Sequence, residues 1–429
     1  MLINIFITLL LLVCSTWILK KLFNLPRNIY LLFMAQPLVA SSAPIIVFIG
    51  GLLSSQIASD PSLATLPITL LILGVAMASV PAALIAKHKG RKFAVYTGFL
   101  TMLSAACLAM FGAKYASFEL FTFASLLFGM GSAFSQQLRF AAIESTQNKD
   151  DIPKTLSILM LSGVFAAFLG PEVAVVAKDW IASPFGYAGS FFLLGLLILL
   201  AMVIMLAFKN PVIQSTLSEG ATRPLKQIVK QPIFIISVVV ATIGYGLMSF
   251  LMTATPLSMH NMQGHSLMDT KWVIQTHIAA MYIPSLFSAF IIQKIGFKGL
   301  MFLGTSLYAL VALIAFSGQA VMHYWWALML LGIGWNFLFL TGTSLLPQSY
   351  QNNERHKVQA ANDFILFAFQ AIASLMAGWL LFKAGWHTVV LSSLPFIITL
   401  FVISFYYVRV CKKNDNHSDA QADNSSKNQ

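Results

Sequence analysis

The residues of this sequence that could do chemistry are a few ionisable side chains inside long apolar stretches. Arg139 lies in the stretch from Phe121 to Ser145, which is long enough to cross a bilayer. A charge inside a span costs about 2.5–3.5 kcal/mol on insertion scales, so it is retained where it faces water or a partner. Regular helical spacing puts five residues on one face of the expected helix: Ser125, Gly129, Ser132, Gln136 and Arg139. This face predicts a wet path through the membrane, which is typical of a transporter.

The composition is that of an integral membrane protein. The 429 residues are 58% hydrophobic and only 9% charged, with a mean hydropathy of +0.81, whereas a soluble domain carries about 25% charge. The net charge of +12 lies in short loops between apolar spans and not on a folded basic face. We therefore expect the lipid bilayer as a partner and no nucleic acid. The three cysteines fit neither a disulfide framework nor a zinc site: Cys14, Cys107 and Cys411.

Twelve apolar segments are long enough to span a membrane. They are 29–56, 62–86, 92–113, 117–145, 152–178, 186–208, 233–258, 268–292, 299–319, 323–346, 355–383 and 386–410. A further apolar stretch, from Leu2 to Leu19, precedes them. It lacks a basic region at its start, and Lys20 and Lys21 follow where a signal peptidase needs small residues. We favour an extra helix or a start site placed too early over a cleaved signal peptide.

The lysines and arginines predict the orientation. If the chain enters the 29–56 span from the cytoplasm, most of the 26 basic residues fall on the cytoplasmic side. Arg139 lies within a span, and four residues fall outside: Lys114, Lys178, Lys271 and Lys383. We therefore expect a multi-pass protein of the inner membrane with both ends of the twelve-helix unit in the cytoplasm.

The expected organisation has five parts. Residues 1–28 form an extra segment with a basic linker, 29–208 a first six-helix bundle, 209–231 a cytoplasmic loop, 232–410 a second six-helix bundle, and 411–429 a disordered tail. The bundles repeat one another, because Gly129-Met130-Gly131 recurs as Gly332-Ile333-Gly334 and the Gly90 region recurs near Gly296. In both matches the two copies are separated by almost the same number of residues, which predicts a duplicated unit.

The sequence resembles the major facilitator superfamily over about residues 29–410. Gly90-Arg91-Lys92 fits the end of the signature that the superfamily carries after its second helix, although Ala83 and Lys87 replace the signature's first Gly and its Asp. Gly170-Pro171 resembles a glycine-proline motif of helix five. Four short segments resemble a poorly characterised bacterial branch: Ala64 to Pro67, Arg139 to Ala142, Gly264 to Ser266 and Asn362 to Phe364. The resemblance implies an all-α fold of twelve transmembrane helices in two six-helix repeats, whose two lobes move in alternation.

On the map that this resemblance implies, one group of polar residues lies toward the cytoplasm. Arg139 and Glu144 belong to helix four, and Asn362 and Asp363 begin helix eleven. We expect Arg139 and Asp363 to form or relay a gate contact between the lobes. The alternatives are an Arg139–Glu144 pair within helix four, or an arginine that snorkels to the interface.

A second group lies toward the outside on that map. Glu172 is on helix five, and Asp269, Gln275 and His277 are on helix eight. Imidazole and a carboxyl group in apolar surroundings are suited to carrying protons. Because helices five and eight meet in the superfamily, we expect Glu172 and His277 to form a proton-coupling site with Asp269 nearby. The alternative is a structural hydrogen bond between the helices.

The resemblance also implies a central cavity lined by helices one, four, seven and ten. The expected cavity residues are Gln36, Ser132, Gln136, Tyr245, Gln275, Trp335 and Asn336. Their mixture of aromatic and amide groups favours a polar or aromatic small molecule. An external loop that begins at Met259 and contains His260 and His265 could hold Cu(I), although no cysteine joins it. We expect no cofactor and no metal.

An enzyme is the first rival class, but the sequence has none of the common nucleotide, zinc-protease or nucleophile motifs. A receptor that kept the fold is the second rival. We expect a monomeric secondary transporter that moves a small polar or aromatic metabolite, of the nutrient, vitamin or siderophore class, by alternating access with a proton as the coupling ion. The alternative is a proton-driven exporter of amphipathic compounds such as drugs.

Overall fold

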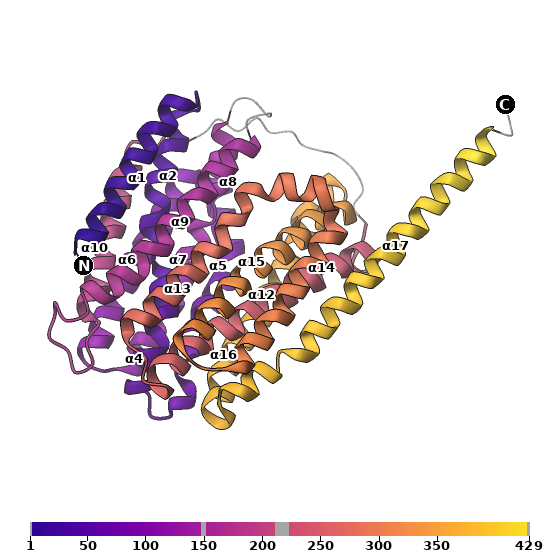
Figure 1. Ribbon diagram of the computed structural model, residues 1–429. Coiled ribbons are helices and arrows are strands. Elements are labelled where there is room, and N and C mark those ends of the chain that lie inside the picture. Colours follow the sequence, from indigo (N-terminus) through magenta and orange to yellow (C-terminus); the bar gives the residue numbers. More distant parts are fainter. Residues whose placement is uncertain (1, 147–151, 211–222, 427–429) are drawn as a thin grey trace.

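A computed structural model describes residues 2–146, 152–210 and 223–426 as a bundle of long helices (Figure 1). Within these ranges, eleven helices are long and apolar enough to cross a membrane. We expected thirteen such segments, and two features of the structure account for the difference of two. The last two expected spans run together as Lys357–Cys411, and α13 has only 16 residues. The all-α membrane fold is thus confirmed.

The N-lobe comprises the helices between residues 29 and 208, and α1 precedes it. The elements are α1 (Leu2–Leu22), α2 (Arg27–Ala40), α3 (Ser42–Ile45), η1 (Ile46–Gly50), α4 (Gly51–Ile57), η2 (Pro61–Leu63), α5 (Leu66–Lys89), α6 (Arg91–Lys114), α7 (Phe118–Ser135), α8 (Leu138–Ser145), α9 (Ile152–Val176) and α10 (Ala188–Met205). The prolines inside α2 and α3 remove backbone donors, and the first span is accordingly built from several pieces.

The C-lobe comprises the helices between residues 232 and 410, and α11 leads into it. The elements are α11 (Leu225–Ile228), α12 (Pro232–Pro256), η4 (Leu257–Met262), α13 (Leu267–Tyr282), η5 (Ile283–Phe287), α14 (Ser288–Ser317), α15 (Val321–Leu345), η6 (Leu346–Ser349), η7 (Asn352–Glu354), α16 (Arg355–Leu391) and α17 (Leu394–Ser426). Helix α17 continues to Ser426, whereas we expected disorder from residue 411. Extending an existing helix avoids the cost of nucleation.

Two glycines let the chain reverse within α14 and α16. Gly296 has φ +64° and Gly385 has φ +78°, which are values that an L side chain rarely adopts. Each glycine lies where we expected one span to end and the next to begin. The turn at Gly296 therefore separates the expected spans 268–292 and 299–319.

Close helix packing confirms the internal repeat. A methyl group added at Gly129 would lie 1.9 Å from the backbone oxygen of Leu71, and one added at Gly332 would lie 2.7 Å from that of His277. The first glycine of each Gly-x-Gly thus holds the fourth helix of its lobe against the second. Small residues allow such backbone contact between membrane helices.

The second glycine of each Gly-x-Gly packs on the third helix. Gly131 faces the backbone oxygen of Gly98, and Gly334 faces that of Gly304, at 2.8 and 3.2 Å from the position of an added methyl group. Both lobes therefore use the same pair of glycine contacts. The duplicated pattern in the sequence reflects a duplicated packing geometry.

The fourth span is not one continuous helix. Helix α7 ends at Ser135 and α8 begins at Leu138, with a turn at Gln136 and Gln137 between them. We expected a single polar face from Ser125 to Arg139. That expectation is wrong beyond Ser135, where α7 ends. The break gives Arg139 its own short helix, α8, near the top of Figure 1.

We name the two ends of the bundle by their charge. The basic side carries the loops and helix ends rich in lysine and arginine, including the end of α1 and the start of α2, and it lies at the top of Figure 1. The opposite side carries α4 and lies at the bottom. By the positive-inside rule, the basic side is expected to face the cytoplasm.

Candidate functional site

An aromatic cluster joins three helices of the C-lobe. Trp335 and Phe339 of α15 stack with ring centroids 5.1 Å apart and planes 8° apart. Tyr245 of α12 meets both rings edge-on, at 5.2 and 5.5 Å, and Phe367 of α16 lies 6.5 Å from Tyr245. Stacked and edge-to-face pairs are the preferred aromatic arrangements. The cluster therefore offers flat, rigid apolar surfaces.

Two helices of this cluster, α12 and α15, also carry buried polar atoms without hydrogen-bond partners, as does α2 of the N-lobe. Among the described residues they include the indole nitrogen of Trp335, the amide oxygens of Gln36 and Asn336, and the hydroxyl of Thr242. These residues belong to α2, α12 and α15. A buried polar atom without a partner costs about 1–3 kcal/mol, which a ligand or a water would relieve. The atoms include both donors and acceptors, as the polar edge of a small molecule requires.

The other expected cavity residues have different surroundings. Asn336 donates from its amide nitrogen to the carbonyl of Met281 and to the hydroxyl of Ser285, which ties α15 to α13 and η5. The Ser132 hydroxyl donates to the carbonyl of Phe128 within its own helix, and Gln136 is exposed after α7 ends. The amide nitrogen of Asn336 thus joins helices within the C-lobe, and only its amide oxygen is left without a partner among the described residues.

A buried ion pair joins the lobes toward the opposite side. The Nζ of Lys271 on α13 lies 2.7 Å from Oε1 of Glu172 on α9, and the two side chains are only 6% and 7% exposed. Asn4 of α1 donates to the same oxygen at 3.3 Å. We expected Glu172 to pair with His277, and that expectation is wrong because Lys271 is its partner. The extra helix thus reaches the polar contact between the lobes.

His277 faces away from α9. Its Nδ1 lies 2.7 Å from the carbonyl of Leu328 on α15, and its Nε2 is buried without a partner among the described residues. Asp269 lies in the exposed first turn of α13, where its carboxylate accepts from the Ser266 hydroxyl and its backbone N–H donates to Ser266, the residue that caps the helix. Gln275 donates to the carbonyl of Phe168 across the lobes at 3.2 Å. The structure thus brings Gln275, and neither His277 nor Asp269, to α9.

Further contacts close the opposite side. Asn261 of η4 donates to the hydroxyl of Ser55 on α4 at 2.7 Å. Thr65 donates to the carbonyl of Leu375 on α16 at 3.3 Å, and an added methyl group at Gly378 would meet Thr65. With the Lys271–Glu172 pair, these contacts span three pairs of facing helices. The lobes are therefore in contact on this side.

The expected gate residues lie on the basic side. Asn362 donates to Asp363 at 3.0 Å on α16, and Arg139 of α8 is close enough for its charge to act on the Asp363 carboxyl group. Arg139 is exposed. The charge of Arg139 in the N-lobe therefore acts on Asp363 in the C-lobe, and the gate contact between them stays a prediction.

Glu144 has a partner that the sequence did not indicate. Arg91 donates from Nε and Nη2 to the two carboxylate oxygens of Glu144, at 2.8 and 2.5 Å, and from Nη1 to Gln137 at 2.8 Å. The arginine of the Gly-Arg-Lys signature thus ties α6 to α8 and to the turn that ends α7. The Gly-Arg-Lys signature was the feature of the sequence that could have indicated this ion pair, because an arginine guanidinium group makes paired hydrogen bonds to a carboxylate.

A third ion pair, between Arg223 and Glu354, fixes the end of the central loop to the C-lobe. Arg223 donates to both oxygens of Glu354, at 2.9 and 2.6 Å, and the Gln351 backbone N–H donates to Glu354 at 2.9 Å. The Arg223 hydrogen bond, more than any other contact, lowers the pKa of Glu354 to about 2. Lys357 donates to the Arg223 carbonyl. The C-terminal end of the central loop is therefore attached to the C-lobe at a defined position on the basic side.

The Met- and His-containing loop is held by ordinary hydrogen bonds. His260 Nδ1 lies 2.9 Å from the carbonyl of His265, and His265 Nε2 lies 2.7 Å from that of Gln319. In the described ranges, no group of three or more His, Cys, Asp or Glu residues is placed to hold a metal ion. One ring nitrogen of each histidine is therefore engaged in holding the loop in place.

Comparison with known proteins gives the family. The model of the Major Facilitator Superfamily matches residues 29–367 and 247–427. A riboflavin transporter, RfnT of Brucella anthropi, is 38% identical over 85% of this chain and 91% of its own. The uncharacterised MFS-type transporter YddS of Bacillus subtilis is 27% identical over 85% of this chain and 86% of its own.

A solved structure agrees with the fold. A bacterial homologue of the human lysosomal transporter Spinster, in an inward-facing and unoccupied conformation, superposes with a TM-score of 0.68 at 12% identity, over 89% of this chain and 96% of that one. The protein is a multi-pass membrane transporter and not an enzyme. The matched family model, the two-lobed helical fold and the repeated glycine contacts together show that this chain belongs to the major facilitator superfamily.

Proposed function

We propose that this protein transports riboflavin, or a closely similar flavin, across the inner membrane. The observation that carries the proposal is the stacked Trp335–Phe339 pair with Tyr245 edge-on to both rings. A flavin ring is flat and aromatic, with polar atoms along one edge and a chain of hydroxyl groups. Such a ring stacks on an aromatic face while its edge takes hydrogen bonds.

The unpaired polar atoms support the same substrate class. Trp335 supplies a free indole N–H, Gln36 and Asn336 supply amide oxygens, and Thr242 supplies a hydroxyl. The side chains of the cluster carry no charge, which suits a neutral solute such as riboflavin. The 38% identity to a riboflavin transporter supports the proposal independently of the site.

The energy source in this proposal is a proton gradient. Glu172 is buried and takes its positive partner, Lys271, from the other lobe. When the lobes separate on the opposite side, the carboxylate loses that partner, and an unpaired buried charge is expensive. Glu172 then needs a proton or another cation, which links lobe movement to proton uptake. Asp363, on which the charge of Arg139 acts on the basic side, supplies a second carboxyl group from which the proton is released.

Uptake by proteoliposomes tests the transport proposal directly. Purified protein in liposomes should accumulate riboflavin when an inward proton gradient is imposed, and a protonophore should abolish the accumulation. Vesicles with the gradient reversed test the exporter alternative, together with a panel of amphipathic drugs. Riboflavin movement that ignores the proton gradient would remove the coupling proposal but keep the substrate. No movement of riboflavin in either direction would remove the substrate proposal.

Variants of Trp335 test the site. Trp335→Ala should weaken riboflavin binding by about 10- to 100-fold, because stacking on one aromatic side chain contributes about 1–3 kcal/mol. Trp335→Phe should keep most of the affinity, since it keeps the flat ring but loses the N–H. The matched control is Trp326→Ala on the same helix, whose side chain is 45% exposed. Equal riboflavin affinity in Trp335→Ala and Trp326→Ala would exclude this site.

A further inference from the structure

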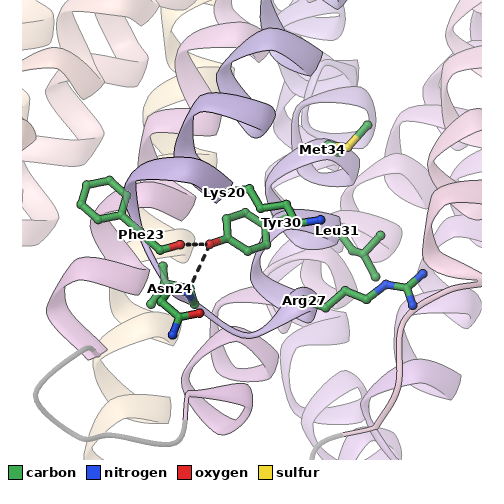
Figure 2. A pocket seen from close by; sticks show the side chains of 8 residues that line it. Lys20, Phe23, Asn24, Arg27, Tyr30, Leu31 and Met34 are labelled. Carbon is green, nitrogen blue, oxygen red and sulfur yellow. Dashed lines mark hydrogen bonds between the residues drawn. The ribbon is translucent and has the colours of Figure 1, made fainter.

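A cavity of about 380 Å³ opens between α1 and α2 on the basic side (Figure 2). Lys20 at the end of α1 and Arg27 at the start of α2 line it, together with Asn24 of the connecting turn. Leu31 and Met34 form apolar walls. The cavity lies apart from the aromatic cluster, which belongs to the C-lobe, and the transport proposal does not use it.

Hydrogen bonds to Tyr30 give the cavity a fixed frame. The Tyr30 hydroxyl donates to the carbonyl of Phe23 and accepts from the backbone N–H of Leu25 at 3.2 Å. Tyr30 is buried, whereas Lys20 and Arg27 are exposed. Figure 2 shows the tyrosine ring between Phe23 and the two basic side chains. The turn between the helices is therefore held in place, and the cavity is part of the fold.

The cavity carries positive charge for which the described residues offer no counter-ion. No ion pair joins Lys20 or Arg27 to an acidic group in the described ranges. Two neighbouring cations that line one cavity repel each other unless an anion lies between them. A phosphate group, which accepts hydrogen bonds from lysine and arginine alike, fits this need.

The apolar wall continues from the charged end toward the bilayer. Arg27, Leu31 and Met34 are spaced i, i+4 and i+7 and share one face of α2. Trp17 and Lys21 indicate where the cavity lies relative to the bilayer. The Lys21 Nζ lies 3.8 Å from the Trp17 ring centroid, and tryptophan and lysine side chains gather at the level of the lipid headgroups. The face thus presents a cation at the headgroup level and then two apolar side chains deeper in the membrane.

We propose that this cavity binds the phosphodiester headgroup of an anionic phospholipid, with an acyl chain against Leu31 and Met34. Basic pockets between membrane helices on the cytoplasmic side recognise such headgroups. The bound lipid joins α1 to α2, and α1 in turn contacts Glu172 through Asn4 at its other end. The lipid therefore fixes the helix that reaches the contact between the lobes.

Thermal unfolding of the purified full-length protein tests this site with three probes: short-chain phosphatidylglycerol, phosphatidylcholine of the same chain length, and inorganic phosphate. Phosphatidylglycerol should raise the unfolding temperature, and the other two should not. Lys20→Gln with Arg27→Gln should bind phosphatidylglycerol about 30-fold more weakly, as expected for the loss of two basic contacts. The matched control is Lys226→Gln with Lys230→Gln, which removes two exposed lysines from the basic side elsewhere.

Each result decides the proposal. An equal response to phosphatidylcholine, or an unchanged response in the Lys20/Arg27 double variant, would overturn it. An equal response to inorganic phosphate would also overturn it and would indicate a site for a soluble anion. If the double glutamine variant does not fold, Lys20→Arg with Arg27→Lys keeps both charges and should keep the response, while Leu31→Ser should weaken binding of the lipid without affecting phosphate. Native mass spectrometry of the retained lipid gives an independent readout.

Discussion

The ammonium group of Lys271 lies 2.7 Å from a carboxylate oxygen of Glu172, and the two residues come from different lobes. Both side chains are almost completely buried, so water screens their attraction very little. The second carboxylate oxygen has no partner among the described residues. The pair therefore stabilises the conformation that is closed on the opposite side and contributes nothing once the lobes separate there.

Lys271→Ala should open the opposite side. Removing one partner of a buried ion pair costs about 3–5 kcal/mol, because the remaining charge is left without compensation. Thr65 is fully buried against α16 in the closed state, so a cysteine placed there reports opening through labelling by a membrane-impermeant maleimide. The native cysteines are first replaced by serine: Cys14, Cys107 and Cys411. Labelling of Thr65→Cys should rise many-fold in Lys271→Ala.

Two further variants separate the pair from a general loss of charge. Glu172→Lys with Lys271→Glu restores the attraction with reversed signs and should bring labelling back toward that of the parent. Lys114→Ala removes an exposed lysine at the end of α6 on the same side and should leave labelling unchanged. If the reversed pair labels as readily as Lys271→Ala, the two charges do not act on each other.

Gly129→Ala should destabilise the N-lobe, because its new methyl group would lie 1.9 Å from the backbone oxygen of Leu71. Backbone cannot move aside as a flexible side chain does, and overpacking typically costs about 1–3 kcal/mol. The control is Gly195→Ala on α10, where the nearest atoms to the new methyl group are at 3.7 Å, an ordinary contact. Thermal unfolding in detergent should show a lower midpoint for Gly129→Ala only, and equal midpoints would contradict the packing argument.

The sequence predicted the spans and the repeat because both depend on local patterns. Apolar length marks a membrane helix, and Gly129 and Gly332 each stand where one backbone must approach another. It did not predict the partner of Glu172. Lys271 and Gln275 are one turn apart and share the face of α13 that meets α9, whereas His277 faces α15. The rotation of α13 follows from packing between the lobes, which no local pattern contains.

The candidate site was predictable only in part, because residue types can be read from the sequence whereas their packing cannot. Tyr245 and Trp335 were identified as residue types that suit a small aromatic solute, and they do meet. Phe339 and Phe367 were missed because a phenylalanine in a membrane span carries no distinctive signal. The break after Ser135 was also missed, since the apolar pattern continues across it and the turn is held by the contact from Arg91 to Gln137.

Docking of the central loop should depend on pH through Glu354. Its pKa is lowered from 4.5 to about 2, chiefly by the hydrogen bond from Arg223. A lowered pKa in the docked state means that docking is fully favoured above about pH 4.5 and is lost as the pH falls toward 2. A spin label at Lys226→Cys in the cysteine-free protein should stay immobile from pH 7 to 5 and become progressively more mobile as the pH falls from about 4.5 toward 2. Glu354→Gln should be mobile throughout, and Glu119→Gln should respond as the parent does.

Arg91→Lys should loosen the basic end of the N-lobe although it keeps the charge. Arg91 makes two parallel hydrogen bonds to Glu144 and a third to Gln137, and a lysine ammonium cannot reproduce that fork. Hydrogen bonds to charged groups are worth about 1.5–3 kcal/mol. Because the Arg91 and Glu144 side chains are 15% and 21% exposed, we expect the lower end of that range and a thermal midpoint lowered by a few degrees.

A double-mutant cycle shows whether Arg91 acts through Glu144. If it does, adding Arg91→Lys to Glu144→Gln should lower the midpoint by clearly less than the two single changes together, because the second change finds the interaction already lost. Arg409→Lys, in exposed α17 on the same side, is the control for the loss of a guanidinium group and should leave the midpoint unchanged. Fully additive effects would mean that the stabilisation by Arg91 comes from Gln137 and the turn after α7, and that Glu144 is only a neighbour.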